Sequence, residues 1–206
     1  MKHPTSRLLH AYWDRLRGER AAPERAEIEP GEIRNLLADS LILELEPQRR
    51  HAAVRLAGTR LCALFGRELR GSAFSDLWGD AEADANGGSW RLVETVAMDT
   101  VGVVAGLQGH TARGGSIDLE LLLLPLRHRG RTQARMLGAL SPHCVPAWLG
   151  QHPVIRLEAT SLRVLGSAAL PDMSDLPADM PPPANDSHPV RRGHLMVHEG
   201  GRLHRT

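Results

Sequence analysis

The sequence predicts an α+β domain with a five-stranded antiparallel sheet, several short helices and an N-terminal helix. Two observations favour this class. A helical pattern at the start of the chain is followed by two short strand patterns, by short helical patterns separated by glycines, and then by three longer strand patterns. The connections between the last three strands are too short for crossover helices, which favours antiparallel pairing.

The chain begins with a predicted amphipathic helix at residues 5–18. One apolar stripe recurs there at helical spacing: Leu9, Tyr12, Trp13 and Leu16. Pro30 stands at a favourable first position for a second, short helix. Residues 40–45 and 53–57 have strand composition and are separated by a polar turn, so we expect them to pair as a hairpin.

Residues 54–78 read V-R-L-A-G-T-R-L-C-A-L-F-G-R-E-L-R-G-S-A-F-S-D-L-W, a strand end, a glycine turn and two short helices. Gly58 ends the strand, and we expect it to adopt a positive φ or to permit a close approach between strand and helix. Thr59 is expected to cap the next helix. Residues 89–98 predict a third helix in this region.

Three strands are then expected at residues 101–107, 117–124 and 132–140. In the middle one, the alternation I-D-L-E-L directs Asp118 and Glu120 outward. Beyond Pro142 the pattern is weaker. Two alternatives stay open for residues 154–165: one more strand or a helix-flanked extension.

The sequence divides into four segments. Residues 1–29 hold the N-terminal helix and a linker, residues 30–145 the core, and residues 146–166 a C-terminal extension. Residues 167–206 contain six prolines between positions 171 and 189 and predict a disordered linker and tail.

Composition narrows the classes of function. A formal net charge of +1 provides no electrostatic case for binding nucleic acid or an anionic membrane. Two cysteines cannot form a disulfide framework or a cysteine-based zinc site. Neither a signal-peptide apolar region nor a membrane-spanning run is present in the sequence, so we expect a cytoplasmic protein.

The stretch R-L-A-G-T-R-L-C-A-L-F-G-R-E-L-R-G at residues 55–71 resembles the bacterial PAS subfamily called PAS_5 or DUF1457. The Tyr-Trp of the first helix and P-A-W-L-G at residues 146–150 are similar to that family too. The resemblance covers roughly residues 5–165. It implies a PAS-like sheet with the short helices on one face and the N-terminal helix at its flank.

The resemblance also implies a sensory or protein-interaction module and carries no catalytic residues with it. PAS domains bind haem, flavin, small metabolites or nothing between the sheet and the short helices. On that basis the expected pocket walls are Leu61, Phe65, Trp78, Trp90, Val101 and Leu121. Many PAS domains also dimerise through an N-terminal helix, so the stripe of residues 9–16 packs either on its own sheet or against a homodimer or protein partner.

Four arginines at residues 55–70 leave two interpretations open. Arg55 and Arg60 could contact an anion, since arginine binds carboxylate or phosphate bidentately. Alternatively the arginines are solvated or pair with Glu68 and Asp76. Cys62 lacks the N-C-R-F-L-Q context of flavin-bonding cysteines, and the helix at residues 89–98 offers no histidine for haem.

We therefore predict no cofactor, no metal site and no enzymatic activity. Two hypotheses about function remain, with an uncharacterised enzyme as a minor third. The first is a sensory module that binds a small molecule and signals to an unknown protein partner, and the second is a ligand-free interaction scaffold. An internal void of about 300 Å³ or more would favour the first, and a filled core the second.

Overall fold

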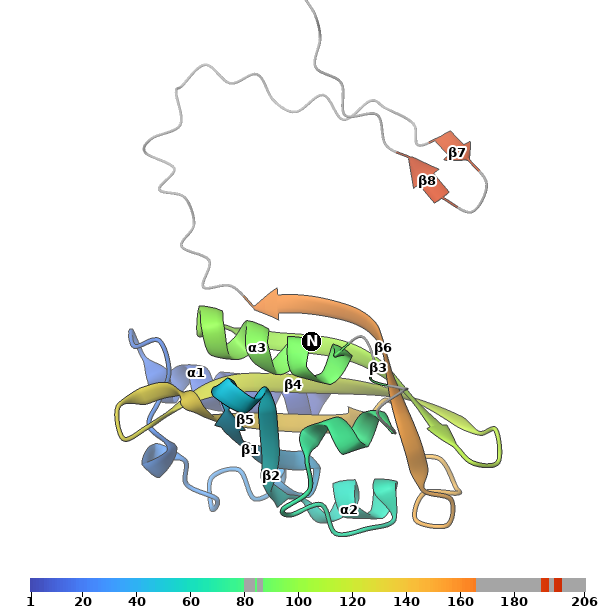
Figure 1. The fold of residues 1–206 in the computed structure, drawn as a ribbon, viewed down its shortest axis with the longest axis horizontal. Helices are drawn as coiled ribbons and strands as arrows, with labels where there is room; N and C mark the ends of the chain where they lie inside the picture. The colour runs from blue at the N-terminus through green and yellow to red at the C-terminus, as the bar shows by residue number, and fades with distance from the viewer. Residues whose placement is uncertain (80–83, 85–86, 166–189, 193–194, 198–206) are drawn as a thin grey trace, which may run out of the picture. The chain divides into compact units, whose positions relative to one another are not determined.

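Six antiparallel strands form the sheet on which the fold is built, in the order β2-β1-β5-β4-β3-β6 (Figure 1). The computed structural model describes residues 1–79, 84, 87–165, 190–192 and 195–197. The strands are β1 Ser40–Glu46, β2 His51–Ala57, β3 Gly102–Thr111, β4 Ser116–His128, β5 Arg131–Pro142 and β6 Val154–Leu165. The antiparallel α+β class is as predicted.

The sixth strand corrects the expected count of five. β6 pairs with β3 from Gly102↔Leu165 to Thr111↔Val154, with two register shifts. Of the two alternatives for this segment, the additional strand is therefore confirmed. The sequence left it open because residues 154–165 mix charged and apolar side chains without strict alternation, as expected of a strand exposed at the edge of a sheet.

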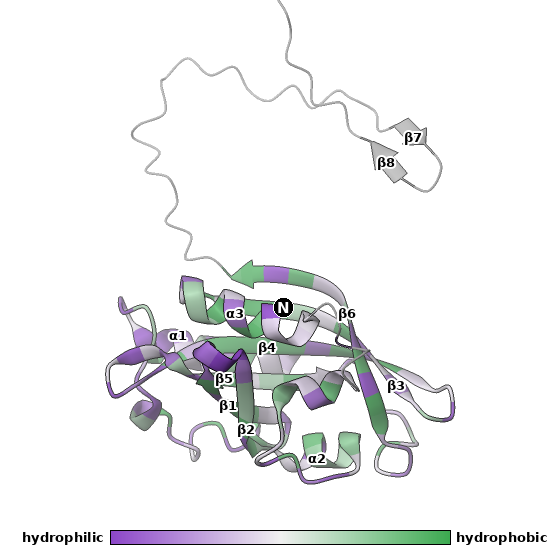
Figure 2. Cartoon of the chain, in the orientation of Figure 1, coloured by the Kyte–Doolittle hydropathy of each residue, from purple (hydrophilic) through white to green (hydrophobic). Residues whose placement is uncertain are grey.

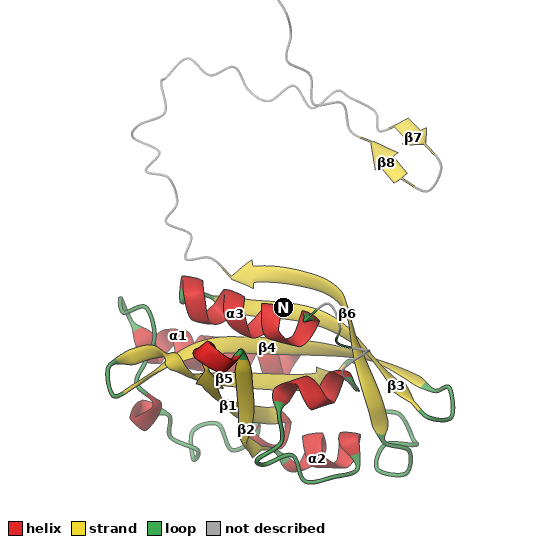
Figure 3. Ribbon diagram, in the orientation of Figure 1, coloured by secondary structure: helices red, strands yellow, loops and turns green. Residues whose placement is uncertain are grey.

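Helices cover both faces of the sheet (Figure 3). The inner face, as we call it, packs against α2 Thr59–Phe65, α3 Gly88–Asp99 and the 3₁₀ helix η4 Phe74–Trp78. The outer face packs against α1 Pro4–Arg17. Three further 3₁₀ helices are η1 Arg25–Glu27, η2 Leu37–Asp39 and η3 Pro47–Arg49. The short helix expected after Pro30 is instead a run of turns that ends in η2.

The two faces bury separate apolar clusters because side chains alternate along each strand. On β4, Leu119, Leu121 and Leu123 face inward, whereas Leu122 and Leu124 face α1. A strand that is apolar on both faces produces the continuous run that the sequence shows, and hydrophobic stretches are visible along the sheet in Figure 2.

Gly58 is required by close packing rather than by its dihedral angle. Its φ is −71°, which any residue can adopt, so the expectation of a positive φ was wrong. A Cβ at this position would lie 2.0 Å from the carbonyl oxygen of Leu37 and 2.3 Å from that of Ala38. Gly58 is itself the N-cap residue of α2, and Thr59 is the first helical residue rather than the cap.

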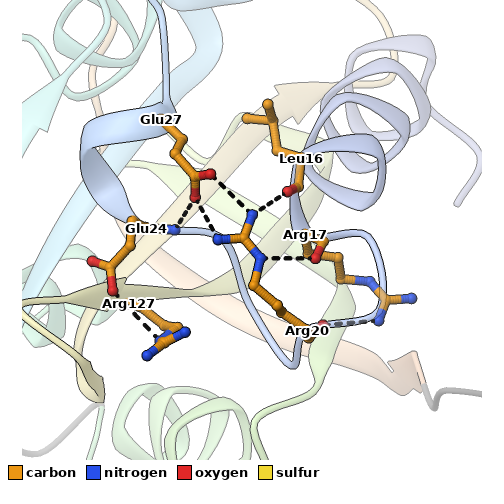
Figure 4. A network of polar contacts seen from close by, with 6 residues as sticks. All are labelled: Leu16, Arg17, Arg20, Glu24, Glu27 and Arg127. Atoms are coloured by element: carbon orange, nitrogen blue, oxygen red, sulfur yellow. Dashed lines mark hydrogen bonds and ion pairs between the residues drawn. The ribbon is translucent and has the colours of Figure 1, made fainter.

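A polar network ties the end of α1 to η1 and β4 (Figure 4). The guanidinium of Arg20 donates to both carboxylate oxygens of Glu27 at 3.0 Å and to the carbonyl oxygen of Leu16 at 2.5 Å. The hydrogen bond from Arg20 holds the pKa of the Glu27 carboxyl below its ordinary value. Glu24 in turn contacts Arg127 of β4 at 3.5 Å.

Residues 168–206 form a second unit. Two three-residue strands, β7 Val190–Arg192 and β8 Leu195–Val197, pair antiparallel within it. The linker and tail predicted at residues 167–206 otherwise lie outside the described residues.

Candidate functional site

Most of the predicted pocket walls belong to one apolar cluster on the inner face. Leu61 and Phe65 of α2, Trp78 of η4 and Leu121 of β4 are all buried in the inner cluster, and Trp90 of α3 packs against it while partly exposed. Val101 is the exception, because it is half-buried just before β3 and lies outside that cluster.

The inner face has a small cavity, and Trp90 is the predicted wall that borders it. Between β2, η4 and α3, a cavity bordered by Ala52, Phe74, Trp90 and Val93 holds about 20 Å³. That is close to the space of a single water molecule. The indole N–H of Trp90 is buried there without a hydrogen-bond partner in the described part of the chain, and the guanidinium of Arg50 lies 6.0 Å from its ring centre.

Arg55 and Arg60 are each engaged by an acidic residue of the chain. Arg60 forms an ion pair with the buried carboxylate of Asp39, and Arg55 contacts Glu44 at 3.3 Å. These partners differ from the Glu68 and Asp76 suggested by the sequence. An anion bound here would have to compete with carboxylates already in place.

The stripe on α1 is buried within the chain. Leu9, Tyr12 and Trp13 pack on the outer face of the sheet, and Leu16 packs against the same cluster. The indole N–H of Trp13 donates to the carbonyl oxygen of Pro125 at 2.8 Å. The arrangement matches the first of the two alternatives, packing on the chain's own sheet, and a dimer through these residues would have to break it.

The apolar part of the outer face is covered by α1 and by residues 22–37. Beyond the start of α1, a row of paired residues crosses four strands: Ser141, Glu120, Gly106 and Ser161. This row lies at a groove of about 580 Å³. The groove is larger than the cavity between β2, η4 and α3. Its polar lining residues include Lys2, Asp118, Glu120, His143, Thr160, Ser161 and Arg163.

Glu120 joins this groove to the start of α1. Its carboxylate accepts the backbone N–H of Lys2 at 2.6 Å and that of His3 at 3.0 Å. Burial favours the neutral acid, but the hydrogen bonds from Lys2 and His3, together with the nearby Ser6 hydroxyl and N-terminal ammonium, outweigh burial and hold the pKa of Glu120 below its ordinary value. The alternation predicted the outward direction correctly. Glu120 is nevertheless only 4% exposed, because the start of α1 covers it.

A β-bulge shapes the opposite wall of the groove. The register between β3 and β6 shifts at Gly106/Leu107, so Thr160 is an extra residue beside Ser161. A Cβ on Gly106 would lie 2.6 Å from the hydroxyl of Ser161 and 3.0 Å from that of Thr160. Glycine therefore leaves room for both hydroxyl groups over the floor of the groove.

The two edges of the sheet differ. The outer side of β2 is occupied, since Val54 exchanges backbone hydrogen bonds of 2.9 and 2.7 Å with Ser72 and Gly71. β6 has no strand on its second side among the described residues. It exposes Leu162 by 51% and Val164 by 46%.

The remaining candidate groups are dispersed. The thiol of Cys62 is partly exposed and lies 3.8 Å from a carboxylate oxygen of Glu68. No group of three or more histidine, cysteine, aspartate or glutamate side chains suited to a metal occurs within the described residues. In the same part of the chain, no helix is both long and apolar enough to span a bilayer.

Sequence reasoning missed the outer groove and the difference between the two edges. The outward Asp118 and Glu120 were a usable signal for the groove, but its second wall comes from β6, whose pairing the sequence left open. The register that places Ser161 beside Gly106 depends on a bulge, which no local pattern announces.

No curated protein matches the chain. Two solved structures are similar at low sequence identity. A chain from a study of a flavin analogue and the light-oxygen-voltage domain mechanism is 16% identical, with a TM-score of 0.40, over 59% of this chain and 87% of that one. The light-state structure of the blue-light photoreceptor Aureochrome1 LOV is 15% identical, with a TM-score of 0.36, over 58% and 91%.

A family model gives the assignment. The model of PAS_5, described as a PAS domain, matches residues 1–141. This span includes α1, the α2 segment that resembled the family, and five of the six strands. Because the match covers more than half of the 206 residues, the chain belongs to the PAS_5 family of PAS domains.

Proposed function

We propose that this chain is a non-catalytic PAS regulatory protein that signals through contact with a protein partner. In this proposal the space between the sheet and the short helices holds no ligand. The protein acts in the cytoplasm, where Cys62 and Cys144, both free thiols, would stay reduced.

The filled inner face is the observation that carries the proposal. Ligand pockets usually measure about 300–1,000 Å³. The cavity between β2, η4 and α3 measures about 20 Å³ and is bordered by Phe74 and Val93, both buried. The hollow of about 340 Å³ on the other side of Trp90 is a surface feature between η3 and α3, lined by the exposed Met98. Admitting a metabolite there would require α3 or η4 to move off the sheet and expose apolar side chains. Of the two hypotheses from the sequence, the interaction module therefore has the better support.

The free edge of β6 is the surface that we assign to the partner. An unpaired strand presents backbone N–H and C=O groups that an added strand can satisfy, and side chains on alternate positions supply specificity. Leu162 and Val164 are two residues apart on one face of β6, as such recognition requires. The occupant we propose is an extended segment of another protein with apolar residues at alternate positions.

Site-specific photo-crosslinking in the host cells tests this. A photoreactive amino acid at Leu162 or Val164 should give one discrete crosslinked protein. The matched controls are Leu56 on β2 and Met98 on α3, which are also exposed apolar residues, and they should give none. The complex rebuilt from the two purified proteins should protect β6 backbone amides from hydrogen exchange.

Two outcomes would contradict the proposal. One is equal crosslinking from the β6 positions and the controls, or protection of β6 amides no greater than that of β2. The other is a small molecule that stays bound to the protein purified from its host, as detected by native mass spectrometry. A Trp78→Ala substitution in the inner cluster would release this molecule, whereas substitutions on the outer face would not.

A further inference from the structure

We infer that the groove on the outer face binds a short zwitterionic peptide of two or three residues. Its carboxylate would bind at β6 and its ammonium group at β4. The groove lies on the face of the sheet opposite to α2 and α3, so this inference does not depend on the inner face or on a protein partner at the edge of β6.

The β6 side of the groove has the groups that recognise a carboxylate. Arg163 is exposed, faces the groove and forms no ion pair with an acidic residue in the described part of the chain. The bulge at Thr160 places two hydroxyl groups, those of Thr160 and Ser161, over Gly106. A guanidinium with adjacent hydroxyl donors can bind a carboxylate through several charge-assisted hydrogen bonds.

The β4 side has the group that recognises an ammonium. The carboxylate of Asp118 is exposed, and its hydrogen bond within the described residues is a long one of 3.4 Å from the amide of Gln108. Glu120 is not available in this way, because the N–H groups of Lys2 and His3 already occupy its oxygens. Asp118 can therefore accept hydrogen bonds from a ligand, while Glu120 holds the wall of the groove in place.

The separation of the two ends selects the length of the ligand. Arg163 lies in register with Val104 and Leu122, whereas Asp118 lies four residues further along β4. Ordinary strand spacing then puts the Cα atoms of Asp118 and Arg163 about 16 Å apart. The two side chains shorten this gap. An extended peptide grows by about 3.5 Å per residue, so a free amino acid is too short to reach both ends and two or three residues can.

Isothermal titration of the full chain with trialanine tests the inference. Binding of trialanine is expected, with at least a tenfold loss of affinity for N-acetyl-trialanine, which lacks the ammonium, and for trialanine amide, which lacks the carboxylate. Free alanine should bind at least tenfold more weakly than the tripeptide. No binding of trialanine, or equal affinity for the blocked peptides, would overturn the inference.

Matched variants locate the binding to the groove. Arg163→Gln should weaken trialanine binding at least tenfold, whereas Arg156→Gln, on the same strand but outside the groove lining, should leave it within twofold. Gly106→Ala, which places a methyl group against the Ser161 hydroxyl, should also abolish binding. The thermal unfolding midpoint of each variant checks folding. Equal effects of the two arginine variants in folded proteins would contradict the assignment, as would full binding by a folded Gly106→Ala.

Discussion

The backbone N–H of Lys2 donates a 2.6 Å hydrogen bond to the carboxylate of Glu120, a residue 118 positions away on the central strand β4. This contact fixes the start of α1 on the outer face of the sheet. It also borders the polar groove, since Lys2 and Glu120 both line it. A single buried acid thus connects the packing of the N-terminal helix with the shape of the candidate ligand site.

Glu120→Gln is expected to lower the free energy of unfolding by about 2 kcal/mol at pH 7. The glutamine amide keeps the size of the side chain but turns an N–H donor toward the N–H groups of Lys2 and His3. Chemical denaturation by urea measures the loss. Asp118→Asn is the control, because Asp118 is exposed, and its effect should stay within about 0.5 kcal/mol.

The same contact predicts a direction for pH dependence. The pKa of Glu120 is held below its ordinary value in the folded protein, so its contribution is fully present above about pH 4.3, the pKa of an unperturbed glutamate. The contribution is lost as pH falls through the lower folded pKa. The stability difference between the protein and Glu120→Gln should therefore shrink under acid conditions. A difference that grows in acid would contradict the assigned role.

Gly58→Ala is expected to be among the most disruptive small substitutions in the chain. The added methyl group would meet the carbonyl oxygens of Leu37 and Ala38 at 2.0 and 2.3 Å, and backbone atoms cannot rotate away. We expect a loss of about 3 kcal/mol or more, on the order of severe overpacking.

Gly31→Ala is the matched control, because nothing lies within 4 Å of the place that its added methyl group would take, and its φ is not positive. It should change the midpoint of thermal unfolding by no more than about 2 °C. If Gly58→Ala unfolded at the same temperature as Gly31→Ala, the result would contradict the close contact between Gly58 and the carbonyl groups of residues 37 and 38.

Arg60→Ala tests the ion pair with Asp39. Asp39 is 2% exposed, so removing its partner leaves a buried carboxylate unpaired. We expect a loss of about 2–3 kcal/mol, less than for a fully buried pair because Arg60 is 44% exposed. Arg55→Ala breaks the more exposed pair with Glu44 and should cost about 0.5 kcal/mol at most. If urea denaturation gave equal losses of unfolding free energy for Arg60→Ala and Arg55→Ala, burial of Asp39 would not be what makes its ion pair important.

The predictable parts of this protein are those in which a local pattern fixes the structure. The spacing of Leu9, Tyr12 and Trp13 predicted the α1 stripe, and alternation placed Asp118 and Glu120 on the same face of β4, although Glu120 is buried. The strands after Gly102 were predicted because connections such as Gly114-Gly115 allow only hairpins.

The remaining features depend on contacts between distant segments. Nothing near Gly58 in the sequence announces the carbonyl groups of residues 37 and 38, so a positive φ and a close approach were both expected there and the segment approached could not be named. Arg60 pairs with Asp39, 21 residues earlier, rather than with the nearer Glu68. The groove exists only because β6 folds back onto β3 with a bulge, which requires the whole sheet to be in place.

Trp13→Phe separates intramolecular packing of α1 from a dimer interface. Trp13 is buried, and its indole N–H donates to the carbonyl oxygen of Pro125. Phenylalanine leaves that acceptor unpaired and a small void, so we expect a loss of about 2 kcal/mol in the free energy of unfolding, independent of protein concentration. Leu8→Ala, on the exposed side of the same helix, should change stability by less than about 0.5 kcal/mol.

Sedimentation velocity of Trp13→Phe over a hundredfold range of protein concentration completes the test. If Trp13→Phe were as stable as the parent chain but sedimented as a smaller species, the stripe would be an intermolecular contact after all, because a residue that packs only within its own chain cannot change the mass of the assembly without first weakening the fold.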